Sequence, residues 1–173
     1  RRVMRVLLDQ NPNMNREDDF RRTVLMKAVE LDDPDVIAQL LRMGADPNAE
    51  DVHGFTALIY ATDYQKPQSV AALLRANVDV DVQSVGGRTA LMFAIIDGSF
   101  KVAEMLVTAG ANLNVQDHKG STALMYAATF LNNSRMNDRR DNAARMEGLI
   151  DMLLRNGADP HLTNKKGQTA DDC

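Results

Sequence analysis

The apolar residues of this chain recur with a long, fixed period. Apolar pairs stand at Leu7-Leu8, Leu40-Leu41, Leu73-Leu74, Leu106-Val107 and Leu153-Leu154. Threonine and alanine keep the same step of 33 positions, at Thr23, Thr56, Thr89 and Thr122 and at Ala28, Ala61, Ala94 and Ala127. The last step of the apolar pairs is 47 positions, which is one period plus an insertion of 14 residues. Several residue types that recur with the same period predict a repeat protein built from small supersecondary units.

Each unit is expected to hold two short helices. A threonine precedes an apolar stretch such as Leu25-Met26-Ala28, where its hydroxyl can accept a hydrogen bond from a free N–H of the first helical turn. Pro34 and Pro67 follow a break and suit the first position of a second helix, because the N–H of that position has no helical partner. Val36-Ile37 and Leu40-Leu41 continue at helical spacing. The pattern therefore predicts an all-α chain of helix pairs.

Glycine marks two positions of the repeat where the backbone is expected to be left-handed. The ends of the second helices carry Gly or Asn, the residues that accept a left-handed helix end: Asn11, Gly44, Asn77, Gly110 and Gly157. A tight turn ahead of each threonine carries Gly54, Gly87, Gly120 and Gly167. Arg21 takes the turn position in the first unit. We therefore expect the first turn to differ from the others or to be strained.

These motifs resemble the ankyrin repeat. Gly44-Ala45-Asp46-Pro47-Asn48 and the opening Asp117-His118-Lys119-Gly120-Ser121-Thr122-Ala123-Leu124 match the family pattern, and Thr-Ala-Leu-Met at 89–92 and 122–125 is similar to its bacterial members. The resemblance implies an ankyrin solenoid spanning 1–173, with four full repeats at 17–49, 50–82, 83–115 and 116–162. Partial repeats are expected at 1–16 and 163–173. Because both termini fall within predicted helices, we expect the chain to be part of a longer protein.

Composition fits such a solenoid. The chain is 45% hydrophobic, but only 5% of its residues are aromatic and it has no Trp. A solenoid packs each repeat only on its neighbours through a thin layer, which needs no large rings. The single Cys173 excludes an internal disulfide framework and a Cys-rich zinc site. A net charge of −4 argues against nucleic-acid binding, and no stretch reaches the ~18 apolar residues that a membrane helix needs.

No catalytic motif is found. The chain has no nucleophile elbow, phosphate-binding glycine loop or His-Glu-x-x-His sequence. His53 and His118 fall in the turns of different repeats, too far apart to share a metal ion. We therefore expect a protein that is not an enzyme, with no metal and no cofactor. Its compartment is left open between the cytoplasm and the bacterial periplasm, since no targeting segment is visible.

The resemblance implies a partner-binding face. Ankyrin proteins bind other proteins through a concave face, made of the turn tips and the exposed ends of the first helices. The positions of this chain that correspond to it are Phe20, Val52, His53, Phe55, Tyr64, Val85, Arg88, Ile96, Asp97, His118, Lys119 and Phe130. The alternative for the rings is that they pack sideways between neighbouring turns. Tyr60, Phe93 and Tyr126 are expected to form a packed ladder between first helices, and Phe100 to lie in the core.

The 14-residue insertion falls near 131–145, between the two helices of the fourth repeat. Asn132-Asn133-Ser134 is expected to break the first helix, and the second helix to begin two or three turns early. The insertion would then stand out from the stack as a prong carrying Arg135, Arg139, Arg140 and Arg145. Such a prong would meet an acidic partner surface. The alternative is a solvated, salt-bridged insertion without a binding role.

These observations predict a non-catalytic module that binds another protein through the concave face and is monomeric on its own. Masking the partner, as an inhibitor or immunity-type protein does, is one use of such binding. The alternative is the recognition arm of a larger enzyme or bacterial effector whose catalytic part lies outside this chain.

Overall fold

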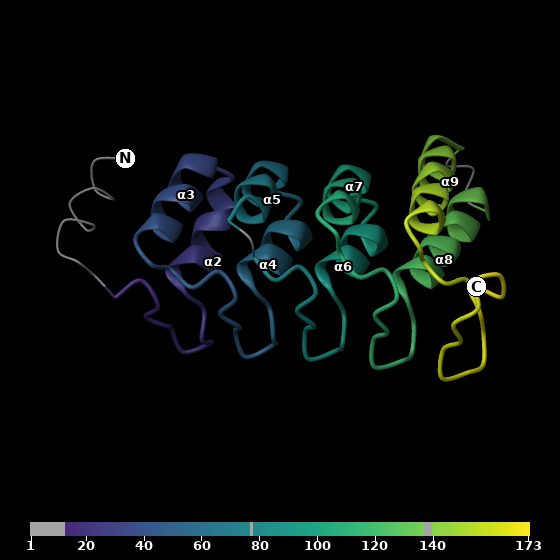
Figure 1. The fold of residues 1–173 in the computed structure, drawn as a ribbon, viewed down its shortest axis with the longest axis horizontal. Coiled ribbons are helices and arrows are strands. Elements are labelled where there is room, and N and C mark those ends of the chain that lie inside the picture. The colour runs from purple at the N-terminus through teal and green to yellow at the C-terminus, as the bar shows by residue number, and fades with distance from the viewer. Residues whose placement is uncertain (1–12, 77, 137–139) are drawn as a thin grey trace.

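A computed structural model describes residues 13–76, 78–136 and 140–173, with the side chains of 135, 136 and 140 left out. Helices are the only regular secondary structure in these ranges: α2 (Val24–Ala28), the 3-10 helix η1 (Val29–Leu31), α3 (Pro34–Arg42), α4 (Ala57–Asp63), α5 (Pro67–Leu74), α6 (Ala90–Ile96), α7 (Phe100–Thr108), α8 (Ala123–Met136) and α9 (Arg140–Arg155). Figure 1 shows the helix pairs side by side in a row, with the turns between pairs projecting in one direction. The predicted all-α solenoid is confirmed.

Threonine caps start the first helix of every repeat. The hydroxyl oxygens of Thr23, Thr56, Thr89 and Thr122 accept hydrogen bonds from the N–H groups three residues on, at 3.5, 3.3, 3.5 and 3.4 Å. Helices α4, α6 and α8 begin 33 residues apart. Pro34 and Pro67 occupy the first positions of α3 and α5, as predicted. Because caps and proline act within one helical turn, the local sequence is enough to place these helix starts.

The core is a series of thin layers between repeats. The largest fully buried side chains are aliphatic or methionine: Leu25, Ile37, Leu40, Leu58, Ile59, Leu73, Leu91, Met92, Ile95, Leu106, Met146 and Leu153. Phe100 joins the core, as predicted, with 7% of its surface exposed. Each repeat therefore packs on its neighbours without large rings, which accounts for the low aromatic content of the chain.

The glycine positions adopt the predicted conformation. Gly44, Gly110 and Gly157 end their second helices with φ between 86° and 96°, whereas Asn11 and Asn77 lie outside the described residues. In the turns, φ is 70° at Gly54 and 79° at Gly87. Arg21 has φ 60° at the same position of the first turn. The first turn therefore keeps the geometry of the others, and a residue with a side chain bears the left-handed backbone.

Replacing Arg21 by glycine is expected to stabilise the protein by about 1 kcal/mol, because the left-handed conformation costs a non-glycine residue about that much. Urea unfolding followed by circular dichroism measures the gain. The change also removes an exposed ion pair between Arg21 and Glu17, whose atoms are 3.4 Å apart. Glu17→Gln removes the same pair and leaves φ unchanged, so it serves as the control. If the free energy of unfolding of Arg21→Gly does not exceed that of Glu17→Gln, then the backbone at Arg21 is not strained.

The insertion has the expected structure only in part: α9 begins about two turns early, as predicted, but α8 does not break. Helix α8 runs unbroken through Asn132, Asn133 and Ser134, so the predicted helix break is wrong. Low helix propensity costs these residues only about 0.5 kcal/mol each, and tertiary packing outweighs it, since Ser134 is buried. Compared with α6 and α7 of the third repeat, α8 ends seven residues later and α9 begins seven residues earlier. The insertion is therefore divided equally, as about two added turns on each helix.

Candidate protein-binding face

The turns between repeats form one continuous row. Each tip is joined to the next by a single backbone hydrogen bond, in which the N–H of the later repeat donates to the carbonyl of the earlier one: Val52 to Phe20 (3.1 Å), Val85 to His53 (2.8 Å), His118 to Gly86 (3.1 Å) and Lys165 to Lys119 (2.9 Å). Figure 1 shows these five turns projecting side by side below the helices. The row gives a rigid edge to any surface built on it.

A small polar residue holds the inside of each turn. Residues Asp18, Asp51, Ser84, Asp117 and Asn164 share this position. The Oδ1 atom of Asp51 accepts the N–H groups of His53 and Phe55, both at 2.8 Å. The side chain of Asp117 binds its own turn in the same way. These acids are missing from the sequence-based site residues, although their 33-residue spacing is a signal that could have found them.

Two tyrosines bind the buried acids from the first helices. The hydroxyl of Tyr60 donates to Oδ2 of Asp51 at 2.7 Å, and that of Tyr126 donates to Oδ2 of Asp117 at 2.6 Å. Burial, followed by the adjacent carboxylate, raises the pKa of both tyrosines. Burial acts to raise the pKa of Asp117, but hydrogen bonds from Tyr126 and from two N–H groups outweigh it, so this pKa is lowered. The lowered pKa keeps Asp117 charged, and the hydrogen bonds to Asp51 and Asp117 hold both rings in place.

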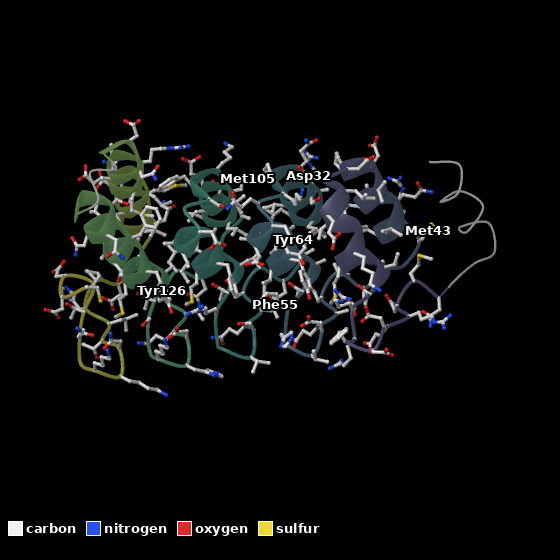
Figure 2. The ribbon with its side chains drawn as sticks, turned by 180° about the vertical axis from the view of Figure 1, so that it is seen from behind. Asp32, Met43, Phe55, Tyr64, Met105 and Tyr126 are labelled. Atoms are coloured by element: carbon white, nitrogen blue, oxygen red, sulfur yellow. The ribbon has the colours of Figure 1, made fainter. Side chains whose placement is uncertain are left out.

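The predicted ladder of Tyr60, Phe93 and Tyr126 is not formed as such. No ring contact joins these three directly among the described residues. The ring of Phe55 lies between two of them instead, with its centroid 5.5 Å from Tyr60 and 5.2 Å from Phe93. Tyr60 also contacts Tyr64, at 5.6 Å. The rings of the second and third repeats form one cluster because Phe55, the residue before the threonine, reaches the first helix of the next repeat. Figure 2 labels Phe55 and Tyr64 of this cluster.

Arginine and phenylalanine alternate at the position before the threonine in the first three repeats, and Ser121 takes this position in the fourth. Arg22 and Arg88 stand two repeats apart, with Phe55 between them. The guanidinium of Arg22 lies 5.3 Å from the ring centre of Phe20, and that of Arg88 lies 5.5 Å from Tyr126. Arg22 is ion-paired with Asp18 at 3.0 Å. Polar and apolar contacts between neighbouring repeats therefore alternate over these three repeats.

A small hollow opens at the first of these polar contacts. Its volume is about 150 Å³, and its lining residues are Phe20, Arg22, Asp51, His53 and Tyr60. This volume suits a single side chain of a partner. The hollow combines ring faces with charged groups, which favours an amphipathic anchor over a purely apolar one.

The predicted site residues divide into exposed and packed groups. Phe20, Val52, Tyr64 and Val85 are 57%, 43%, 40% and 65% exposed, and His53, Asp97, His118 and Lys119 are also exposed. The half-buried group is Phe55, Arg88, Ile96 and Phe130. Phe130 packs edge-on against Phe100 with centroids 5.9 Å apart, so its ring serves the fold as well. Leu31, 62% exposed at the register of Tyr64, belongs with the exposed group and was not among the predicted site residues.

Acidic groups gather at the ends of the first helices. Asp63 ends α4, and Asp97 follows the last residue of α6. A negative charge at a helix C-terminus opposes the helix dipole. Partial desolvation of its carboxylate, and then repulsion from Asp63, raises the pKa of Asp97. These acids lower helix stability, so their presence favours a role in contacts with a cationic group.

The arginines proposed for the prong cannot be compared as a set. Arg139 lies outside the described residues, as do the side chains of Arg135 and Arg140. Arg145 is described, and its guanidinium lies 4.8 Å from the ring centre of Phe100. The side chain of Arg145 therefore packs on the neighbouring third repeat, at the start of α7. Figure 1 shows α8 and α9 rising above the other helix pairs.

Neither metal binding nor membrane insertion finds support in the part of the chain that the structure describes. No group of three or more His, Cys, Asp or Glu side chains there could hold a metal ion. None of the described helices is long and apolar enough to cross a membrane.

Comparison with known families accounts for nearly the whole chain. A family model described as "Ankyrin repeats (3 copies)" matches residues 1–84 and 64–136, and one described as "Ankyrin repeat" matches residues 119–165. No curated protein matches the chain.

Proposed function

The chain belongs to the ankyrin repeat family, whose members are generally protein–protein interaction modules, and from this premise we propose that it binds a protein partner through its concave face. We define the concave face as the turn tips together with the exposed ends of the first helices. Binding there masks the partner's own active or binding surface, as an inhibitor does. The module itself carries out no chemistry.

One observation carries this proposal. Among the described residues, five of the seven exposed large apolar side chains belong to the concave face, namely Phe20, Leu31, Val52, Tyr64 and Val85. Exposed apolar residues gathered on one surface mark interaction sites, whereas single scattered ones do not. Figure 2 shows Phe55, Tyr64 and Tyr126, from the second and fourth repeats, on the side of the first helices. The surface therefore offers apolar anchors with polar groups around them, as binding interfaces do.

The double variant Leu31→Ala with Tyr64→Ala is expected to weaken partner binding at least tenfold, because both side chains are exposed, although Tyr64 also touches Tyr60, and an interface anchor is worth more than 1 kcal/mol. Phe55 and Phe130 are less suitable, since they also pack within the protein. Titration calorimetry with the partner captured from the source cells measures the loss. Inhibition of that partner at one-to-one stoichiometry tests the masking.

Leu154→Ala is the matched control. Leu154 is 42% exposed, as Tyr64 is 40% exposed, but it lies on α9 in the layer of second helices. Circular dichroism confirms that each variant is folded. Wild-type affinity of the double variant, or an equal loss in Leu154→Ala, would exclude the concave face as the binding site.

A further inference from the structure

The row of turn tips changes character from one end to the other. The tips of the first three turns expose the apolar side chains of Phe20 (57%), Val52 (43%) and Val85 (65%), with the polar Asp19 and His53 beside the first two. The tips of the last two turns expose basic ones: His118, Lys119, Lys165 and Lys166. The division falls at Gly86, which has no side chain. Because the backbone hydrogen bonds fix the order of the tips, the apolar and basic halves are held end to end.

The basic half carries a net positive charge. The carboxylate inside the fourth turn, that of Asp117, is buried and already engaged by Tyr126 and by its own turn. Neither Lys119 nor Lys165 nor Lys166 forms an ion pair with any described residue. The first turn differs, because its acid Asp18 is paired with Arg22 and with Lys27 at 3.0 and 2.9 Å. In a chain of net charge −4, these lysines are a local excess of cation.

The fold does not require the apolar and lysine side chains at the turn tips. A turn of this kind needs a left-handed residue and a capping oxygen, which Gly87 and Ser84 supply in the third repeat. The side chain of Val85 then projects into solvent at the tip, where burial contributes nothing to stability. The lysine ammonium groups likewise stabilise no described contact. Their common placement on one rigid edge points to contacts outside the chain.

We propose that the row of turn tips is a two-part docking strip for a segment of another protein, with apolar side chains on one half and carboxylates on the other. This deepens the proposed function and rests on it. Valine and phenylalanine tips take the apolar half of the segment, and the lysine tips take the acidic half. Neighbouring repeats lie about 8–10 Å apart, so the five tips span roughly 35 Å. An extended segment of about 11 residues covers that distance at about 3.3 Å per residue.

Charge and shape favour a protein segment over a nucleic acid. Three apolar tips offer nothing to a phosphate backbone, and the described basic tips provide one small ring, that of His118, rather than a row of rings on which successive bases could stack. The hydrogen-bonded tips are fixed before binding, so only the bound segment loses conformational entropy. An acidic, partly apolar peptide satisfies both halves, whereas an oligonucleotide satisfies one.

Synthetic 12-residue peptides test the strip directly. One half of each peptide consists of Leu and Val and the other half of Asp and Glu. Two versions are made, one with the apolar half first and one with the acidic half first. Matched peptides carry Asn and Gln in place of the acids. Fluorescence anisotropy with the whole chain measures binding at 50 mM and 500 mM salt. We expect at least one acidic order to bind tenfold more tightly than its amide analogue at low salt, with the difference shrinking at high salt.

Variants of the strip locate that binding. Lys165→Glu with Lys166→Glu is expected to abolish the preference for the acidic peptide, and Val52→Thr with Val85→Thr to weaken both the acidic peptide and its amide analogue severalfold. The control, Lys101→Glu with Arg155→Glu, makes the same charge change on α7 and α9 in the second-helix layer. Circular dichroism checks folding.

Several results would overturn the strip. The first is equal affinity for the acidic and amide peptides, and the second is an unchanged affinity of the lysine variant for the acidic peptide. The third is tighter binding of a 12-nucleotide single strand than of either peptide. Failure of the strip is separable from failure of the proposed function. If the natural partner still depends on Leu31 and Tyr64 while the peptides and strip variants show no effect, the concave face stands and the strip is wrong.

Discussion

Alanine in place of Gly87 is expected to lower the free energy of unfolding by about 3 to 4 kcal/mol. The backbone at Gly87 has φ 79°, which costs a residue with a Cβ about 1–2 kcal/mol. The added Cβ would also lie 2.6 Å from the backbone nitrogen of His118 and 2.7 Å from its ring. Backbone atoms cannot move away without opening the junction between the third and fourth turns, so overpacking adds about 1–3 kcal/mol.

Gly110→Ala separates the two contributions. Gly110 has φ 86°, but a Cβ placed there meets no atom within 4 Å. Its substitution should therefore cost only the backbone strain, about 1–2 kcal/mol. Urea unfolding compares the two variants, and hydrogen exchange shows whether the loss begins at the third-to-fourth junction, as nearest-neighbour packing requires. Equal costs at Gly87 and Gly110 would show that the close approach of the two turns contributes nothing.

Asp117→Ala is the second substitution expected to be costly, at about 3 kcal/mol. The aspartate is 5% exposed, and its carboxylate accepts the N–H groups of Lys119 and Ser121, each at 2.8 Å, and the hydroxyl of Tyr126. Alanine leaves these donors without their acceptor. Each buried donor left unsatisfied costs about 1–3 kcal/mol, less where water can enter.

Asp117→Asn is the matched control, because Asn164 performs the same capping in the last turn. We expect it to cost less than alanine, since its amide oxygen still accepts both N–H groups. The charge is tested by pH. The pKa of Asp117 is lower in the folded chain than the ~3.9 of an unfolded aspartate. The carboxylate therefore stabilises the fold above about pH 4, and this contribution is lost as the pH falls through the lower folded value.

Chemical denaturation from pH 7 to pH 2 measures this dependence. The wild-type protein should lose its advantage over Asp117→Asn on acidification, because both side chains are then neutral. A difference that stays constant down to pH 2 would show that the charge of Asp117 has no part in the turn.

Most of the fold could be predicted because its signals are local. A threonine cap or a proline start acts within one turn of the helix it begins. Glycine fills eight of the eleven left-handed positions among the described residues, and Arg21, Asp32 and Gln65 fill the other three. Of these three, Arg21 could be identified from its place in the period. The 33-residue spacing then multiplies each local signal by the number of repeats. Helix pairs, turn positions and the thin core all follow from these short-range rules.

Contacts between repeats could not be predicted in the same way. Phe55 packs on Phe93, which is 38 residues away, and Phe130 packs on Phe100. Such partners depend on how one repeat sits on the next, and the spacing alone does not reveal it. The insertion shows the same limit, because Asn132-Asn133-Ser134 has poor helix propensity, yet buried Ser134 lies in an unbroken α8. Propensity is a weak guide wherever tertiary packing decides.

The equal division of the insertion bears on how the domain can vary in length. Seven residues are close to two helical turns, with a phase error of only about 20°. Each helix can therefore gain a heptad and still present the same side to its partner, so the lower part of the fourth repeat keeps its packing. The length of the α8–α9 hairpin can therefore change in steps of about 10 Å, which is the rise of seven helical residues. Further heptads added in matched pairs would raise a grafted loop or label away from the stack without touching the row of turns.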